Sequence, residues 1–388
     1  MEKLPNSAGQ LPSGVGGRYS EGAKPSARPF GDSPEDSAFG GAPGAGRPLQ
    51  TRKGRWPLQA LRDRPVLYVM AIFSVLVATA LYSLRRDGIF ACPASAYDGN
   101  HYLAYCNVGG YGDYDHGAFW FGLEPAARDF AVSADVLFVG NSATEFGFST
   151  PASERWFAAN GSRFYLLGFS HFENSTFIEP LLSRLHPRAR AYVVNVDRFF
   201  SDQETVIGHD VMRGSDMRRW YIVKQGWQPP HRMLCTWQAR LCGHALSFYR
   251  QRETGEWRLT GSEIGLTPSE IGRELPADAA LVAQEKARAE SFIAKLGVAP
   301  QCVFLTYVPS KANERATAAD LASALGFELI SPRISDLHTF DGIHLDPPSA
   351  ERFASAFFDI GGARLRQCLN SNGTRSGADT SKETRGRR

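Results

Sequence analysis

The feature that most constrains this chain is an uncharged stretch, residues 65–84, which reads PVLYVMAIFSVLVATALYSL. As an α-helix, about 20 apolar residues span the hydrocarbon core of a bilayer. A cleaved signal peptide usually has a shorter apolar region, of about 7–15 residues, that ends at small residues. We therefore expect residues 65–84 to form one transmembrane helix that is retained as a signal anchor. A buried core helix is the other interpretation of such a run.

Charge on the two sides of this span predicts its orientation. Basic residues gather before it, and apart from two arginines the segment after it is acidic. The residues concerned are Arg52, Lys53, Arg55, Arg62 and Arg64 before the span, and Arg85, Arg86, Asp87, Asp98, Asp113 and Asp115 after it. Because positive charge favours the cytoplasmic side, we expect a cytoplasmic N-terminus and a C-terminal domain in the periplasm, held at the inner membrane.

Six cysteines fit an exported domain, because disulfides persist in oxidising compartments. Cys92 and Cys106 lie close together in the sequence, and so do Cys235 and Cys242. Cys302 and Cys368 stand apart, and we expect them to be free thiols. The spacing matches no zinc motif, so we predict neither a metal site nor a cofactor.

The two ends of the chain have a composition typical of disorder. Residues 1–64 and 369–388 are rich in small and polar residues and poor in large apolar ones. Such segments bury too little apolar surface to offset their ordering entropy. Over the whole chain, 43 Lys and Arg balance 40 Asp and Glu, which argues against a nucleic-acid partner.

Between the span and the C-terminal tail, the chain alternates predicted strands and helices. Apolar runs predict strands at 135–139, 163–169, 191–196, 302–308 and 327–330, and amphipathic patterns predict helices at 151–160, 174–185, 277–296, 314–325 and 349–358. This alternation predicts an α/β domain, residues 133–368, with a mostly parallel sheet covered on both sides. We interpret residues 85–132 as an irregular lead-in and residues 202–275 as an insertion that forms a lid or a substrate wall.

Ser142 follows the first predicted strand directly, in Val139-Gly140-Asn141-Ser142. Sites in open α/β sheets form at the carboxyl ends of the strands, where turn N–H groups can bind an oxyanion. We expect a loop over residues 143–149 to connect this turn to the next helix. Gly-Asn-Ser is also a common turn with no catalytic role.

A second motif, Asp341-Gly342-Ile343-His344, precedes the last predicted helix. Asp341 is near enough in the chain to fix the tautomer of His344 and to stabilise its cation. His344 is then a candidate base for the serine hydroxyl, which is a weak nucleophile by itself. A solvated surface pair is the alternative interpretation.

Taken together, the two motifs resemble those of the SGNH, or GDSL-like, hydrolase superfamily. The first family block, Gly-Asp-Ser, corresponds to residues 140–142, and the last block, Asp-x-x-His, corresponds to residues 341–344. The resemblance implies a flavodoxin-like three-layer α/β/α fold and an ester hydrolase or acyltransferase. It also implies oxyanion donors after the second and third strands. The nearest residues there are Gly168, with His171 as the alternative, and Asn195.

Other polar and aromatic residues are weaker candidates. His171 and Glu173 follow the second strand, and Asp197 with Arg198 ends the third as a local ion pair. Four tryptophans of the insertion are candidates for a sugar-stacking platform, although large aromatic residues more often pack a core. These are Trp220, Trp227, Trp237 and Trp257.

The sequence therefore supports two hypotheses of different classes. In the first, the chain is a membrane-anchored serine esterase or acyltransferase. It acts on a small ester or on O-acyl groups, O-acetyl foremost, of an extracytoplasmic polysaccharide or glycan. Ser142 is the nucleophile, and Asp341 and His344 complete the site. In the second, the same fold is a non-catalytic module that binds a glycan or scaffolds the cell envelope.

Overall fold

The computed structural model describes residues 65–108, 110–261 and 267–370. The tails predicted to be disordered, 1–64 and 371–388, lie outside this range. Leu369 and Asn370, which we assigned to the C-terminal tail, instead complete the last helix, α12 (Pro347–Asn370). Leu369 is buried there, so the domain extends past its predicted end at residue 368, and the helix extends past its own predicted end at residue 358.

The apolar span forms one helix, α2 (Pro65–Asp87). Within it, Pro65–Ser83 is long and apolar enough to cross a membrane, and none of its apolar window is buried by protein. The core-helix interpretation requires burial, so the exposure of this helix favours a membrane anchor.

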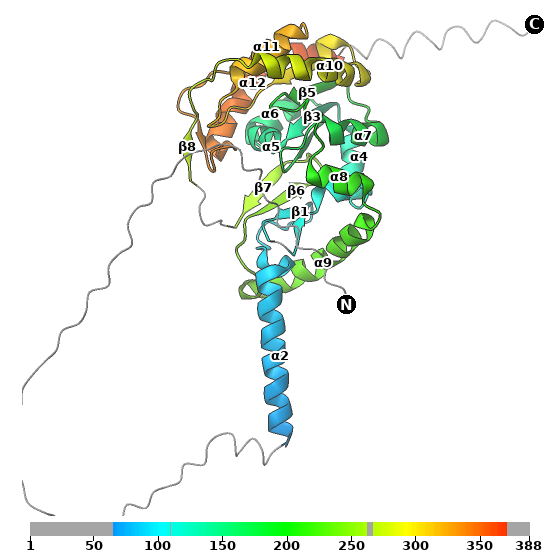
Figure 1. Ribbon diagram of the computed structural model, residues 1–388, viewed down its shortest axis with the longest axis vertical. Helices are drawn as coiled ribbons and strands as arrows, with labels where there is room; N and C mark the ends of the chain where they lie inside the picture. The colour runs from blue at the N-terminus through cyan, green and yellow to red at the C-terminus, as the bar shows by residue number, and fades with distance from the viewer. Residues whose placement is uncertain (1–64, 109, 262–266, 371–388) are drawn as a thin grey trace, which may run out of the picture. The chain divides into compact units, whose positions relative to one another are not determined.

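The chain beyond the anchor is a mixed α/β structure built on a four-stranded parallel sheet (Figure 1). Its strand order is β4–β3–β5–β9. The bounds are β3 (Val136–Asn141), β4 (Phe164–Phe169), β5 (Ala191–Asn195) and β9 (Val303–Thr306). The fifth predicted strand, 327–330, reduces to one parallel bridge between Leu305 and Leu329. The apolar runs therefore located all four strands to within a few residues.

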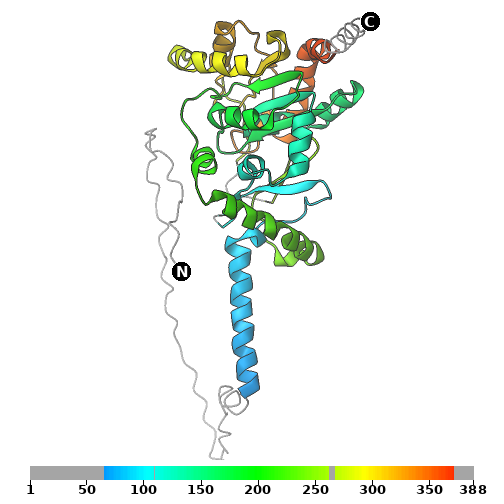
Figure 2. The ribbon, with the colours of Figure 1, turned by 90° about the vertical axis from the view of Figure 1, so that its right-hand side faces the viewer.

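Helices cover both faces of this sheet (Figures 1 and 2). Side chains of the strands alternate between the two faces, and each face has its own core. Leu137, Val139 and Val194 pack in the core of one face. The helices that contribute to it include α4 (Pro125–Ser133), α7 (Ser175–Leu185), α10 (Ala279–Lys295) and α11 (Arg315–Ala324). Val136 and Phe138 pack on the other face. The helices there are α5 (Ser142–Phe148), α6 (Pro151–Ala159) and α12.

The lead-in, which we predicted to be irregular, is ordered. It contains β1 (His101–Cys106), β2 (Gly112–Asp113), the helix α3 (Asp115–Trp120) and α4. These strands join a second, antiparallel sheet with two strands of the insertion, in the order β2–β1–β6–β7. The partners are β6 (Ser247–Gln251) and β7 (Trp257–Thr260). Local sequence patterns cannot show a pairing between segments so far apart in the chain, which is why the lead-in was wrongly assigned.

The insertion also supplies two helices and a short strand. They are α8 (Val206–Arg213), α9 (Met217–Trp237) and β8 (Ser269–Glu270). β8 pairs with β10 (His338–Thr339), just before the Asp341 loop. Short 3-10 turns complete the described elements: η1 (Ile89–Ala91), η2 (Ala239–Leu241) and η3 (Pro300–Cys302).

All six cysteines form disulfides. The pairs are Cys92–Cys106, Cys235–Cys242 and Cys302–Cys368. The expectation that Cys302 and Cys368 are free was therefore wrong. They lie 66 residues apart in the sequence, but α12 returns to the start of β9 and brings their Cα atoms to 5.6 Å.

Candidate active site

Ser142 lies where a buried strand passes into a helix with no loop between them. β3 ends at Asn141, and α5 begins at Ser142 itself. Because the chain is helical from Ser142 to Phe148, the prediction of a loop over residues 143–149 is wrong. Asn141 caps this helix by accepting a hydrogen bond from the Ala143 N–H at 2.9 Å. Gly140 permits the tight turn, since a Cβ there would lie 2.2 Å from Thr144 Oγ1.

Three side chains from two distant parts of the chain converge at this turn. His344 Nε2 lies 2.7 Å from Ser142 Oγ, and His344 Nδ1 lies 2.6 Å from Asp341 Oδ2. Ser142 is 8% exposed, and the side chains of His344 and Asp341 are 13% and 18% exposed. The order Ser–His–Asp matches the arrangement of a serine hydrolase, and each of the three residues keeps part of its surface exposed.

The loop that carries Asp341 and His344 is fixed from within. Phe340 donates its N–H to the carbonyl of His344 at 3.0 Å, which closes the turn. Asp341 Oδ1 accepts the backbone N–H groups of Ile343 at 2.9 Å and His344 at 2.8 Å. Both residues of the pair are thus positioned by the backbone as well as by each other.

Electrostatics favour an ionised Asp341. Burial raises the pKa of its carboxyl, but hydrogen bonds and charge from His344, and the two backbone N–H groups, outweigh this and leave the pKa below its ordinary value. An ionised Asp341 can only accept a hydrogen bond, so it holds the proton on Nδ1 of His344. Nε2 is then free to accept the proton of Ser142.

Aromatic rings enclose His344 on two sides. Phe340 stacks on the imidazole with ring centroids 5.6 Å apart, and Phe146 of α5 approaches it to 4.7 Å. Phe146 in turn packs against Phe248 and Trp257, which come from β6 and β7 of the insertion. The insertion thus forms an apolar wall beside the triad. No local sequence pattern indicates this contact, because Phe146 lies in a segment that we read as a loop.

Gly168 is not available as an oxyanion donor. It pairs in register with Gly140, and its N–H donates to Glu145 Oε1 at 2.8 Å. A side chain at this position would lie 2.6 Å from the carbonyl of Asn141, so the glycine is required by close packing. The family resemblance placed a donor here, and the structure corrects this assignment.

Asn195 contacts the cap of α5. Its Nδ2 lies 3.4 Å from Asn141 Oδ1, and its Oδ1 accepts the Val308 N–H at 3.3 Å. Asn195 is 1% exposed. Asn195 therefore contacts the side chain of Asn141, the residue that directly precedes Ser142 in the chain.

The turn after β4 has an unusual backbone. His171 and Phe172 both have positive φ, 60° and 54°, although neither is glycine. Conformations of this kind cost about 1–3 kcal/mol each and cluster at functional sites. The turn follows Phe169, whose register partner is Asn141, so it lies at the same sheet edge as Ser142. Among the described residues, no acceptor is found for the His171 N–H.

A buried ionic cluster anchors α5, the helix that begins at Ser142. Glu145 of α5 accepts from Arg250 Nη1 at 3.0 Å, and Arg250 also pairs with Asp115 at 2.7 Å. The arginine donates further to the carbonyls of Leu166 and Gly168 on β4. Glu145 and Arg250 are wholly buried, and Asp115 is nearly so. Neither alternation nor spacing in the sequence singled out these residues.

The weaker sequence candidates have other partners. Glu173 is buried and accepts from His116 Nε2 at 3.0 Å and from Thr205 Oγ1 at 2.7 Å, so it does not line the site. Arg198 pairs with Glu314 rather than with the neighbouring Asp197. Burial, reinforced by the charge of Glu314, raises the pKa of Asp197 to about 6, while its hydrogen bond with Asn141 opposes this shift.

The tryptophans of the insertion separate into two groups. Trp257 packs beside the triad, stacked on Phe248 with centroids 5.0 Å apart. Trp220, Trp227 and Trp237 are exposed on α9 instead. A shared sugar platform made of all four is therefore wrong.

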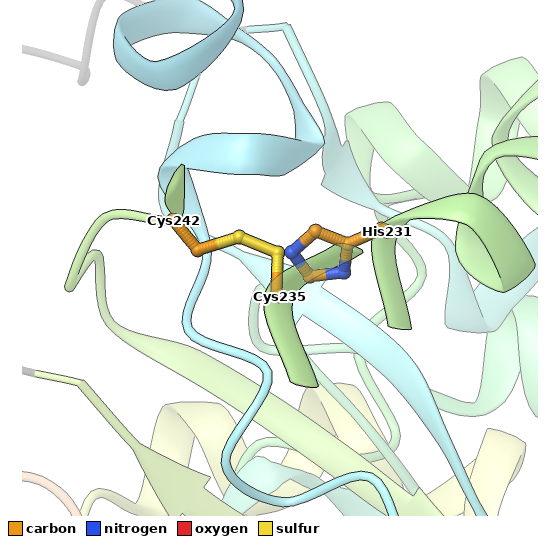
Figure 3. A group of neighbouring side chains, drawn as sticks. All are labelled: His231, Cys235 and Cys242. Carbon is orange, nitrogen blue, oxygen red and sulfur yellow. A yellow bond between two sulfur atoms is a disulfide. The ribbon is translucent and has the colours of Figure 1, made fainter. Parts of the chain in front are cut away.

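Within the described part of the chain, His231, Cys235 and Cys242 are the one group of side chains close enough to share a metal ion (Figure 3). The two sulfur atoms form a disulfide, which leaves no thiolate to bind a metal. His231 Nε2 lies 3.0 Å from the carbonyl of Cys92, and Nδ1 lies 3.2 Å from the Tyr97 hydroxyl. These residues thus form a packed structural cluster.

No family model matches the chain, and no match is found among curated proteins or solved structures. The candidate function therefore rests on the geometry of the site.

Proposed function

We propose that this chain is a membrane-anchored serine esterase or acyltransferase of the SGNH-like type. One observation carries the proposal: Ser142, His344 and Asp341 lie in hydrogen-bonded series at 2.7 and 2.6 Å, although 198 residues separate the serine from the aspartate. A surface ion pair explains Asp341 and His344 alone, but it does not explain why Nε2 meets a serine at the start of a helix.

The proposed reaction follows from these contacts. Ser142 Oγ attacks the acyl carbon while His344 Nε2 takes the hydroxyl proton. The tetrahedral intermediate collapses, and the departing alcohol oxygen takes that proton from His344. Water or a sugar hydroxyl then attacks the acyl-enzyme, and His344 accepts its proton and returns it to Ser142. Water as acceptor gives an esterase, and a sugar gives an acyltransferase.

Stabilisation of the oxyanion is assigned to backbone groups. The first N–H groups of a helix have no partner inside it, and Ser142 is the first residue of α5. The strained turn at His171 supplies a second N–H at the same sheet edge. We assign the oxyanion hole to these two N–H groups in place of Gly168 and Asn195.

The fold and topology support an extracytoplasmic role. Helices on both faces of a sheet ordered β4–β3–β5–β9 fit a flavodoxin-like three-layer arrangement. Three disulfides fit an oxidising compartment such as the periplasm. We propose that the N-terminus is cytoplasmic and that the substrate is an O-acylated, foremost O-acetylated, envelope glycan or a small ester.

The test uses the full chain in detergent, p-nitrophenyl acetate as substrate and a fluorophosphonate as probe. Ser142→Ala is expected to abolish labelling and to reduce turnover to background, and His344→Ala is expected to reduce turnover by at least about 10³-fold. Ser183→Ala and His244→Ala, which change exposed residues of the same types, serve as matched controls and retain full activity.

A second function, a non-catalytic glycan-binding or scaffold module, is favoured by one observation. The Gly168 N–H, where the family resemblance places a donor, is already donated to Glu145. If the wild-type chain neither reacts with the fluorophosphonate nor hydrolyses the ester above the Ser142→Ala background, the enzyme proposal fails and this alternative takes its place.

A further inference from the structure

Helix α9 has one buried face and, opposite to it, an exposed apolar face. The buried stripe repeats every three or four residues and faces the antiparallel sheet and the segment after the anchor. It comprises Tyr221, Lys224, Gln228, His231 and Cys235. In Figures 1 and 2, α9 lies on the side of the antiparallel sheet that faces away from the parallel sheet.

The opposite side of α9 is exposed and apolar, which is unusual for a helix at the surface of a water-soluble domain. Ile222 is 41% exposed, Val223 is 44%, Met233 is 66% and Trp237 is 80%. At 100° per residue, these side chains lie on the face opposite to the buried stripe. Met233 and Trp237 are exposed over most of their surface, and Ile222 and Val223 over somewhat less than half of theirs.

The charge of α9 has a single sign. The helix contains no Asp or Glu, while Arg218, Arg219 and Arg232 are exposed along it and Arg240 follows its end. An exposed apolar stripe that begins at Arg219, with further arginines and tryptophans beside it, is typical of a helix that lies in a membrane interface. Its apolar side chains then enter the acyl region, and its cations meet lipid phosphates.

The chain itself holds α9 close to the candidate anchor. The apolar span ends at Ser83, and Phe90 already packs on α9, with its ring 5.5 Å from His231 and 6.4 Å from Trp227. Gly243, just beyond α9, donates its N–H to the Phe90 carbonyl at 2.8 Å. Seven residues reach at most about 25 Å when extended, so α9 stays within that reach of the point where the chain leaves the bilayer.

We propose that α9 lies in the interface of the same membrane that holds the anchor, with Ile222, Val223, Met233 and Trp237 among the lipid acyl chains and the arginines at the phosphates. The occupant of the exposed stripe is thus a phospholipid surface. This proposal uses the apolar span and the packing of Phe90, and it is independent of the triad.

The test uses the full chain in nanodiscs of phosphatidylethanolamine and phosphatidylglycerol that contain a phospholipid with a photoactivatable carbene precursor in its acyl chain. After illumination and digestion, mass spectrometry locates the labelled peptides. We expect label in the anchor and in residues 218–240. A peptide of α12 that contains Ile360, 56% exposed, is the internal reference. Labelling of α9 is expected to exceed that of α12 by at least about fivefold.

Variants make the test specific. Met233→Asp with Trp237→Asp is expected to reduce labelling of α9 to the level of α12, while the anchor stays labelled and the melting temperature changes little, because these side chains are 66% and 80% exposed. Ile360→Asp is the matched control and leaves labelling of α9 intact. Labelling of α9 no stronger than that of α12 in the wild type overturns the proposal, whether hydrogen exchange then finds α9 open to water or shielded by a second protein.

Discussion

Arg250 offers the sharpest test of how this fold holds its candidate nucleophile. Its guanidinium is fully buried and joins Asp115 of α3 to Glu145 of α5. It also donates to three carbonyls, at Leu166, Gly168 and Gly255. One side chain on β6 therefore ties the antiparallel sheet to the edge strand β4 and to the helix that begins at Ser142.

The expected loss in the free energy of unfolding follows from the buried groups that Arg250→Met leaves without a partner. Removing one partner of a buried ion pair costs about 3–5 kcal/mol, because the remaining charge has no compensation. Here two carboxylates and three carbonyls lose donors, and each buried group left unsatisfied costs about 1–3 kcal/mol. These terms are not additive, so we expect a loss of about 5 kcal/mol in the free energy of unfolding. That is a large fraction of the 5–15 kcal/mol typical of a folded protein.

Urea unfolding of the full chain in detergent, followed by tryptophan fluorescence, measures this loss. Arg258→Met is the control: this arginine of β7 is 54% exposed, and its ion pair with Asp98 spans 3.5 Å, so its removal is expected to cost less than about 1 kcal/mol. Adding Asp115→Asn and Glu145→Gln to Arg250→Met is expected to restore part of the stability, since neither carboxylate that Arg250 contacted then remains. A loss below about 1 kcal/mol for Arg250→Met refutes the reasoning.

Three further predictions concern the triad, a buried carboxyl and a disulfide. Asp341→Asn is expected to lower kcat for p-nitrophenyl acetate by about 10⁴-fold, because the amide no longer holds the proton on Nδ1 of His344. An unchanged rate would remove Asp341 from the mechanism. Burial raises the pKa of Glu145 to about 8 against the opposing charge of Arg250. The folded state therefore holds this proton more tightly, and its stabilising effect is lost as the pH rises from about 4.5 to about 8. Glu145→Gln is expected to flatten the unfolding free energy over that window, and an unaltered pH profile would contradict this. Cys302→Ser with Cys368→Ser is expected to cost about 4 kcal/mol in urea unfolding, because that disulfide closes a loop of 66 residues, and the Cys235→Ser with Cys242→Ser pair about 2 kcal/mol for a loop of 7. Equal losses for the two pairs would argue against chain entropy as the cause.

The parallel sheet was predictable because each strand is buried on both faces and reads as a continuous apolar run. Val136–Asn141 and Ala191–Asn195 have no exposed residue, so their sequences needed no partner to be recognised. The sequence pattern placed Ser142 directly after such a strand and His344 in the loop before the last helix. The meeting of these two residues was an inference from a family resemblance, and their 2.7 Å contact gives it a geometric basis.

The antiparallel sheet was not predictable, because its strands are recognised only by their pairing with distant segments. His101 of β1 pairs with Gln251 of β6, and no local pattern links two segments so far apart. The same holds for Arg250, which reads as an ordinary polar residue of a strand until Asp115 and Glu145 surround it. Gly168 was wrongly assigned to the oxyanion because a glycine in a strand indicates that another group approaches closely, but not which group. Here the approaching group is the side chain of Glu145.

The assignments of Gly168 and Asn195 to the oxyanion failed for a common structural reason. Glu145 lies one turn after Ser142 on α5, so the side chain that accepts the Gly168 N–H also fixes the helix that begins at Ser142. The N-cap of the same helix is held by Asn195. The two residues that the family resemblance assigned to the oxyanion therefore act here on the first turn of α5. It follows that substitutions at Asn195 or Glu145 should displace Ser142 relative to His344, whereas substitutions in the turn at His171 should affect stabilisation of the oxyanion.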